Sequence, residues 1–359
     1  MLLWIWLGFV LGALTLALLV FPHWREAWLS RLQRSGQRVE VAGQQWAKVV
    51  QHGGRKKLTP RNIAKKIESS LPDSISTRLR AISDATGLTG LLVGNKIPGV
   101  DKGTGAEINH ILRLTKRAGT QRQVDAKIAE FTASRELTQV EQDAISAIET
   151  FSFYGNRNHT KTGEHDAIRL AWWTRPFPGN YGDWLSPLVY AGYTDRNIVA
   201  QTVSGVATHK HIFSLGSIGR FIKHNSVVVG TGISSEDVEL NPHADYISVR
   251  GPVTAKVVAA SGGPKVESFG DPGVLLSRLI PIERATTNGR IALVRHFTHR
   301  GIPLNLRDDM DELDVLMSHP HAIHEFIVKL AKYDRVVTSA MHVFITCQSY
   351  GIPCALVTF

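Results

Sequence analysis

The feature that most restricts the fold is a series of short valine- and isoleucine-rich runs in the second half of the chain, separated by glycine turns and helical stretches. Parallel strands need a crossover, usually a helix, so this alternation predicts an α/β fold with parallel sheets. Ligands of such sheets bind beyond the carboxyl ends of the strands. The predicted strands are Ile198–Val203, Ser226–Val229, Tyr246–Val249, Lys265–Ser268, Ile291–Val294, Arg335–Thr338 and Cys354–Val357.

Small, polar and basic residues follow several of these strands. Gly230, Thr231 and Gly232 form a turn whose backbone amides can approach an anion. Arg250 and Arg295 each place a guanidinium at a strand end. Taken one at a time, a glycine turn is usually only a turn, and an arginine at the rim is as often an ion-pair partner as an anion ligand.

The histidines and cysteines carry no metal or redox signature. His319 and His324 lack a companion carboxylate at helical spacing, so we predict no metal site. Cys347 and Cys354 have neither zinc-ligand spacing nor the pattern of a disulfide framework. His342 lies in an apolar stretch, which by itself favours a buried, hydrogen-bonded histidine.

The amino-terminal segment has the pattern of a membrane anchor. Leu2–Phe21 is an uncharged run of 20 residues, and a helix rising about 1.5 Å per residue would cross a hydrocarbon core of roughly 30 Å. No basic segment precedes the run and no clear small-residue cleavage site follows it, which favours an anchor over a cleaved signal peptide. The positive charges that follow predict a single-pass protein whose body lies on the cytoplasmic side of the inner (plasma) membrane.

The net charge of +10 is concentrated beside this run. The chain has 11 lysines and arginines against 2 acidic residues through Lys66, and 30 against 29 after it. A basic block next to an apolar helix is expected to bind anionic lipid headgroups. We therefore predict a membrane and no nucleic acid as partner.

The composition along the chain divides it into four parts. We expect a transmembrane anchor over 1–22, a basic juxtamembrane and helical region over 23–165, and Rossmann-like domains over 166–285 and 286–359. Thr138 and Glu141 have the spacing of a capping box that starts a helix. The last predicted strand ends near Phe359, so either the N-terminal helices cover its apolar face or the chain is a fragment.

An ordered set of motifs spans the second half of the chain. The motifs are, in order, Asn180-Tyr181-Gly182-Asp183, Gly216-Ser217-Ile218, Gly230-Thr231-Gly232, Arg250-Gly251-Pro252, Gly270-Asp271-Pro272-Gly273, Ser339-Ala340-Met341-His342 and Gly351-Ile352-Pro353. In this order, from about residue 180 onward, they resemble the polysaccharide pyruvyl transferase family. The motifs that begin at Asn180, Arg250 and Ser339 are the most specific.

The resemblance implies two Rossmann-like domains similar to the glycosyltransferase type B arrangement. It also implies transfer of pyruvate from phosphoenolpyruvate to two hydroxyls of a sugar, forming a cyclic ketal. The acceptor would be a surface or secreted glycan or its lipid-linked precursor. Phosphoenolpyruvate would be the donor substrate, with no cofactor and no metal.

By the same similarity, His342 would be the general acid/base. Asp183 would be a base or, with Asn180, a ligand of the acceptor sugar. The donor carries a phosphate and a carboxylate, which guanidinium groups bind well. The implied donor ligands are Arg250, Arg295, Gly230, Thr231, Gly232 and Ser339.

Two positions depart from the family pattern. Ala340 stands where many members have an arginine, and Val343 where a glycine follows the histidine, so Arg295 or Lys329 would supply the anion contact. These departures leave open the alternative that the chain is a non-catalytic, membrane-tethered member of a glycan-assembly complex. A nucleotide-sugar-dependent glycosyltransferase would share the fold, because fold alone does not fix function.

The segment before the first motif is aromatic. Trp172, Trp173 and Phe177 can stack on an acceptor sugar or pack in the core, and packing is favoured.

Overall fold

The computed structural model describes residues 97–133, 135–158, 166–205, 207, 209–284 and 286–358. The predicted anchor, Leu2–Phe21, and the basic block through Lys66 lie outside these ranges. Within them, no helix combines the length and apolar character needed to span a membrane.

Three helices precede the first sheet: α6 (Lys102–Leu114), α7 (Gln121–Thr132) and α8 (Gln139–Gly155). Asp101 caps α6 by accepting hydrogen bonds from the amides of Gly103 and Thr104, at 2.8 and 3.1 Å. At the start of α8, the Thr138 hydroxyl accepts from the Glu141 amide, and Glu141 Oε2 accepts from the Thr138 amide at 2.8 Å. The predicted capping box is confirmed.

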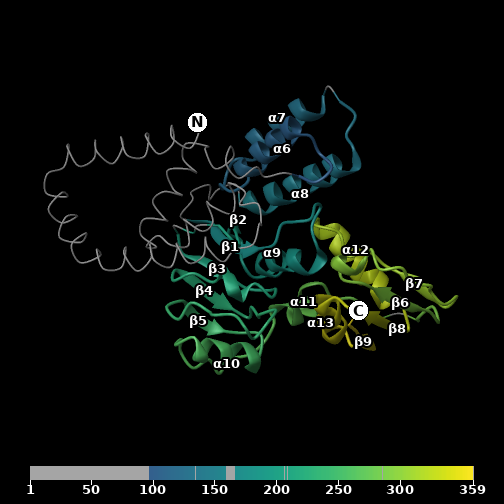
Figure 1. Ribbon diagram of the computed structural model, residues 1–359. Coiled ribbons are helices and arrows are strands. Elements are labelled where there is room, and N and C mark those ends of the chain that lie inside the picture. Colours follow the sequence, from purple (N-terminus) through teal and green to yellow (C-terminus); the bar gives the residue numbers. More distant parts are fainter. Residues whose placement is uncertain are drawn as a thin grey trace, which may run out of the picture. The chain divides into compact units, whose positions relative to one another are not determined.

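The first sheet is wholly parallel, with the strand order β2-β1-β3-β4-β5 (Figure 1). Its strands are β1 (Ile168–Trp172), β2 (Ile198–Thr202), β3 (His211–Phe213), β4 (Ser226–Val229) and β5 (Asp245–Ser248). Helix α9 (Tyr181–Tyr193) connects β1 to β2, and η2 (Gly219–Phe221) lies between β3 and β4. After β5 come α10 (Pro252–Ala260), η3 (Pro272–Leu275) and α11 (Leu276–Leu279).

The second sheet is also parallel, in the order β7-β6-β8-β9. Its strands are β6 (Ile291–Val294), β7 (Met310–Glu312), β8 (Arg335–Thr338) and β9 (Cys354–Leu356). The 3-10 turn η4 (Phe297–His299) follows β6, α12 (Pro320–Ala331) joins β7 to β8, and α13 (Met341–Ser349) joins β8 to β9. The prediction of parallel α/β sheets is confirmed, and the strand orders are consistent with Rossmann-like folding.

Helices α9, α11 and α13 lie between the two sheets and contact one another (Figure 1). The Tyr181 hydroxyl of α9 and the Thr346 hydroxyl of α13 are 2.7 Å apart in a fully buried contact. The rings of Phe151 of α8, Trp172 of β1 and Trp184 of α9 pack with centroids 4.6–5.6 Å apart. Trp172 is therefore a core residue, as the packing interpretation predicted.

Most of the predicted strands are present. The bounds of β4, β6 and β8 match the prediction. Strands β2 and β9 are one residue shorter at the carboxyl end, and β5 is shifted by one residue toward the amino terminus. The predicted strand Lys265–Ser268 is wrong: this segment is irregular, and only Phe269 forms a single bridge, to Val249. Val266 is the one buried residue of the segment, and the Lys265 and Glu267 side chains beside it are largely exposed.

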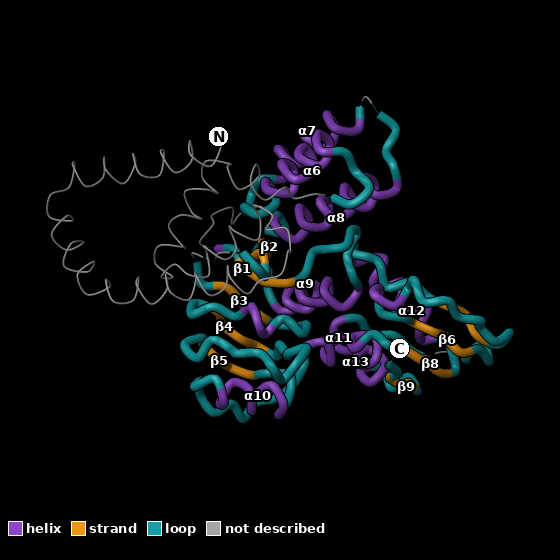
Figure 2. The backbone as a smooth tube through the Cα atoms, viewed as in Figure 1, coloured by secondary structure: helices purple, strands orange, loops and turns teal. Residues whose placement is uncertain are grey.

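In each sheet, the second strand is added on one side of the first strand, and all later strands are added on the other side. The reversal falls between β1 and β3 in the first sheet and between β6 and β8 in the second. At such a point, the segments that follow two neighbouring strands run to opposite faces of the sheet and leave a crevice between them. Ligands of these sheets bind in this crevice. Figure 2 shows the loops that leave the strands of both sheets.

Candidate active site

A cavity of about 510 Å³ opens where the segments that follow β1, β3, β6 and β8 come together. These four strands flank the two reversal points. The start of α9 and the start of α13 complete its wall. The lining residues are Trp173, Arg175, Asn180, Tyr181, Gly182, Asp183, Gly216, Ser217, Ser234, His296, Phe297, Val315, Ala340, Met341, His342 and Val343.

The first turn of α9 presents Asn180 and Asp183 to the cavity. The Val315 carbonyl accepts a hydrogen bond from the Tyr181 amide at 2.7 Å and holds this helix start against the segment after β7. Asn180 Nδ2 donates to Asp183 Oδ2 at 2.9 Å. Burial raises the pKa of Asp183 to about 6, although the Asn180 hydrogen bond and the charge of His342 act in the opposite direction. Asp183 is thus poised to exchange a proton near neutral pH.

His342, in the first turn of α13, lies between Gly182 and Asp271. A methyl group on Gly182 would sit 2.5 Å from His342 Nδ1, so the absence of a side chain there lets the ring approach α9. His342 Nε2 is 3.5 Å from Asp271 Oδ2, the separation of an ion pair, and no aligned hydrogen bond reaches this nitrogen. The predicted pair His342 and Asp183 therefore lines one cavity.

Asp271 connects His342 to Arg250. One oxygen, Oδ2, lies 3.1 Å from Arg250 Nε as well as near His342, and the other accepts from the Gly273 amide at 2.9 Å. Burial by itself would raise the pKa of Asp271, but His342, Arg250 and this amide outweigh it and hold the pKa below its usual value. An ionised carboxylate behind the imidazole holds the orientation of the ring.

Arg250 reaches the cavity wall through Ser217. Its Nη1 donates to Ser217 Oγ at 3.0 Å. Gly232 leaves room for the guanidinium, because a methyl group there would lie 2.8 Å from Arg250 Cζ. Arg250 Nη2 is buried and has no hydrogen-bond partner among the described residues. A ligand anion is one group that would satisfy it.

The turn after β4 supports Arg250 and does not offer its amides to a ligand. The Gly230 amide donates to the Ser248 carbonyl at 3.0 Å, and the Gly232 amide donates to the Gly216 carbonyl at 2.9 Å. Thr231 Oγ1 also donates to Gly216, at 2.9 Å. Both amides already have partners, so the predicted anion contact by Gly230 and Gly232 would require them to give up these bonds.

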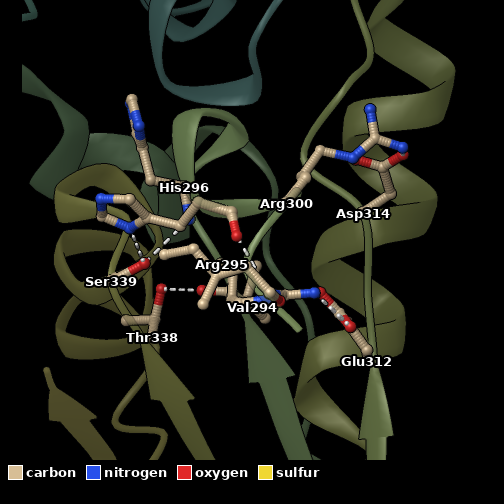
Figure 3. Close-up of polar contacts among 10 residues, drawn as sticks. Val294, Arg295, His296, Arg300, Glu312, Asp314, Thr338 and Ser339 are labelled. Carbon is tan, nitrogen blue, oxygen red and sulfur yellow. Dashed lines mark hydrogen bonds and ion pairs between the residues drawn. The ribbon is translucent and has the colours of Figure 1, made fainter. Parts of the chain in front are cut away.

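Arg295 likewise does not reach the cavity. Figure 3 shows its side chain turned toward Glu312, which accepts from Nε at 2.6 Å and from Nη2 at 3.0 Å. Nη1 donates to the carbonyls of His299 and Ile302. All three nitrogens are engaged within the protein, so the predicted contact between Arg295 and the donor would require these bonds to break.

Ser339 supports the loop after β6. Its hydroxyl accepts from the His296 amide at 2.9 Å and lies 2.8 Å from His299 Nδ1, and Figure 3 shows it beside His296. It is not among the residues that line the cavity. Lys329 lies exposed on α12, also away from it. Neither residue contacts a ligand placed in this cavity.

Sequence patterns missed three residues of the site, Asp271, Arg175 and His296. Asp271 stands in the quoted Gly270-Asp271-Pro272-Gly273 motif, and His296 comes soon after the predicted strand Ile291–Val294, so both had a signal, whereas Arg175 had none. Burial lowers the pKa of His296, and the charges of His299 and His342 add to this effect. No group of His, Cys, Asp and Glu side chains suited to a metal ion occurs in the ranges that the structure describes.

Comparisons with known proteins give a family match that covers both sheets. The sequence pattern of the polysaccharide pyruvyl transferase family matches residues 150–358, which include both sheets and the cavity. An uncharacterized protein of Acanthamoeba polyphaga mimivirus is 25% identical over 186 residues, which are 50% of this chain and 64% of that protein. The chain thus spans just under two thirds of the length of this curated relative. No solved structure matches significantly. The chain belongs to the polysaccharide pyruvyl transferase family, a family of transferases.

Proposed function

We propose that this protein transfers pyruvate from phosphoenolpyruvate to two hydroxyls of a sugar in a polysaccharide or its lipid-linked precursor, forming a pyruvate ketal. The observation that carries the proposal is the arrangement of His342 and Asp183 on one cavity, with Arg250 and Asp271 behind the imidazole. It provides two side chains that can exchange protons, together with a cation, which are what this chemistry requires.

The reaction begins at the methylene carbon of the donor. His342, protonated and oriented by Asp271, delivers a proton to this carbon, and the adjacent carbon becomes electrophilic. Asp183 accepts the proton of the first sugar hydroxyl as its oxygen bonds to that carbon. The imidazole left neutral by the first step can then take up a proton again.

The second half releases phosphate. As the bond between carbon and phosphate oxygen breaks, the second sugar hydroxyl bonds to the same carbon and gives up its proton, which leaves with the phosphate. Asp183 returns its proton to the neutral imidazole, which restores both groups. In total, two carbon–oxygen bonds and one carbon–hydrogen bond form, the carbon–carbon π bond and one carbon–oxygen bond break, and no redox change occurs. Arg250 would stabilise the departing phosphate through its unsatisfied Nη2.

The acceptor would enter beside Trp173. This side chain is 37% exposed, lines the cavity and stands edge-on to Phe221 with centroids 5.3 Å apart. A rigid aromatic face on the wall of a cavity suits a sugar ring. Asn180 and Asp183 would then bind acceptor hydroxyls.

We also propose that the two sheets are arranged as in type B glycosyltransferases and that the body works at the cytoplasmic face of the inner membrane. The position of the cavity between the carboxyl ends of two parallel sheets supports the first point. The apolar run Leu2–Phe21 and the basic residues after it support the second.

A thermal-shift titration of the full chain tests the donor. Phosphoenolpyruvate at a hundred times its dissociation constant should add about 2.7 kcal/mol of stability, and Arg250→Gln should remove most of this gain. Arg290→Gln is the matched control, because Arg290 pairs with Asp311 and does not line the cavity. Stabilisation by nucleotide sugars and none by phosphoenolpyruvate would instead indicate a glycosyltransferase.

A further inference from the structure

We propose that Arg175 binds an anionic group of the donor and that Asn109 of helix α6 positions it. The inference rests on the proposed function and extends it to a residue that the family motifs do not include. Arg175 lines the cavity. Asn109 lies outside the residues that match the family, 150–358.

The charges around the cavity single out Arg175. Arg250 is paired with Asp271 and Arg295 with Glu312. Arg175 has no carboxylate partner among the described residues, and its one hydrogen bond is from Nη2 to the neutral Asn109 Oδ1 at 3.0 Å. A partly buried cation without a counter-ion is costly unless an anion joins it. The donor, with a phosphate and a carboxylate, brings that anion.

The geometry of the Arg175 side chain leaves N–H groups that can donate hydrogen bonds to a ligand. The Arg175 guanidinium lies over the Phe177 ring, 4.4 Å from its centroid, so its plane is fixed on one side. The bond to Asn109 fixes one nitrogen, and the remaining N–H groups have no acceptor among the described residues. A planar fork held in this way is suited to binding a carboxylate or phosphate with two hydrogen bonds. Burial also lowers the pKa of Arg175, which is consistent with its missing counter-ion.

Asn109 connects helix α6 to Arg175 and thereby to the site. Its Nδ2 donates to the Gly105 carbonyl of the same helix at 2.6 Å, which orients Oδ1 toward Arg175. Asn109 is buried and does not line the cavity, so it acts through Arg175 and is a positioning residue.

The test measures the dissociation constant of phosphoenolpyruvate for the full-length variants Arg175→Gln, Arg175→Lys and Asn109→Ala, together with KM and kcat. Loss of a charge-assisted, two-bond contact should weaken donor binding about 10- to 100-fold in Arg175→Gln. Arg175→Lys keeps the charge without the planar fork and should fall between Arg175→Gln and the wild type. Asn109→Ala should raise KM for the donor with kcat within about twofold, a split that a merely structural role would not produce.

Arg135→Gln is the matched control. Arg135 also lies over a phenyl ring, 4.2 Å from the centroid of Phe131, and also bonds to α6 through Glu107, but it does not line the cavity. Its substitution should leave donor affinity unchanged.

The outcomes separate the two proposals. If the wild type binds phosphoenolpyruvate and Arg175→Gln or Arg175→Lys binds it equally well, the assignment of Arg175 is wrong and the proposed function stands. A rise in KM for the acceptor alone would also overturn it. If the wild type does not bind phosphoenolpyruvate at all, the proposed function fails and this inference fails with it.

Discussion

Gly182→Ala tests the close approach of α9 to the imidazole of His342. The added methyl carbon would lie 2.5 Å from His342 Nδ1 and 2.8 Å from both Cβ and Cγ, whereas ordinary contact begins at 3.4 Å. The imidazole and the helix must therefore separate by almost 1 Å. The crowding falls on the ring and on Cβ, so rotation of a flexible side-chain end cannot relieve it.

The magnitude follows from this displacement. Moving a catalytic group by about 1 Å can reduce the rate roughly 100-fold. Overpacking a well-filled site costs roughly 1–3 kcal/mol of stability. Gly182→Ala should therefore lower kcat about 100-fold while the chain still folds.

The assay is the steady-state rate of transfer, with Tm measured on the same samples. Gly192→Ala is the matched control, because it is the same substitution in the same helix, where the new methyl group would meet the flexible end of Leu279. It should lower Tm and leave kcat near that of the wild type. A Gly182→Ala enzyme that turns over within twofold of the wild type would refute the assigned position of His342.

Three further predictions concern other parts of the site. Burial raises the pKa of Asp183 from 3.8 to about 6, so the folded chain holds this proton more tightly than the unfolded chain and ionisation destabilises the fold as pH rises through that range. Asp183→Asn should abolish transfer. It should also raise the free energy of unfolding by roughly 3 kcal/mol at pH 8, and this gain should fade below pH 4. An equal gain at both pH values would contradict this. Trp173→Ala should raise the acceptor KM roughly tenfold and leave the donor KM unchanged, and the reverse pattern would place the donor at this side chain. Arg295→Gln should lower Tm, because Glu312 and two carbonyls lose their partner, while calorimetry should show an unchanged Kd for phosphoenolpyruvate; a tenfold rise would restore Arg295 as a donor ligand.

Local patterns predicted much of the fold. The runs that became β4, β6 and β8 are short segments rich in valine and isoleucine between turns, and the capping box of α8 is a local signal. The short strands β3 and β7 were missed, because three residues such as His211–Phe213 or Met310–Glu312 carry too few apolar side chains to stand out. Strand β1 was missed because Arg169 interrupts it and Trp172 lies in an aromatic segment that did not indicate a strand.

The site was predictable where a motif carries the residue itself. Asp183 and His342 line the cavity, and Arg250 reaches its wall. Sequence spacing could not show that Arg295 pairs with Glu312, because the partner is on the neighbouring strand β7. Nor could it show that Arg175 has a neutral partner, because Asn109 lies 66 residues away on α6.

The most direct test of the account is to measure phosphate release from phosphoenolpyruvate and the mass of a panel of glycan acceptors, using the full chain and His342→Asn. The account predicts that phosphate release depends on one acceptor, that this glycan gains a pyruvate ketal for each phosphate released, and that His342→Asn loses both while remaining folded. A His342→Asn protein that transfers pyruvate as fast as the wild type, or a wild type that leaves phosphoenolpyruvate intact and instead adds a sugar from a nucleotide sugar, would contradict it.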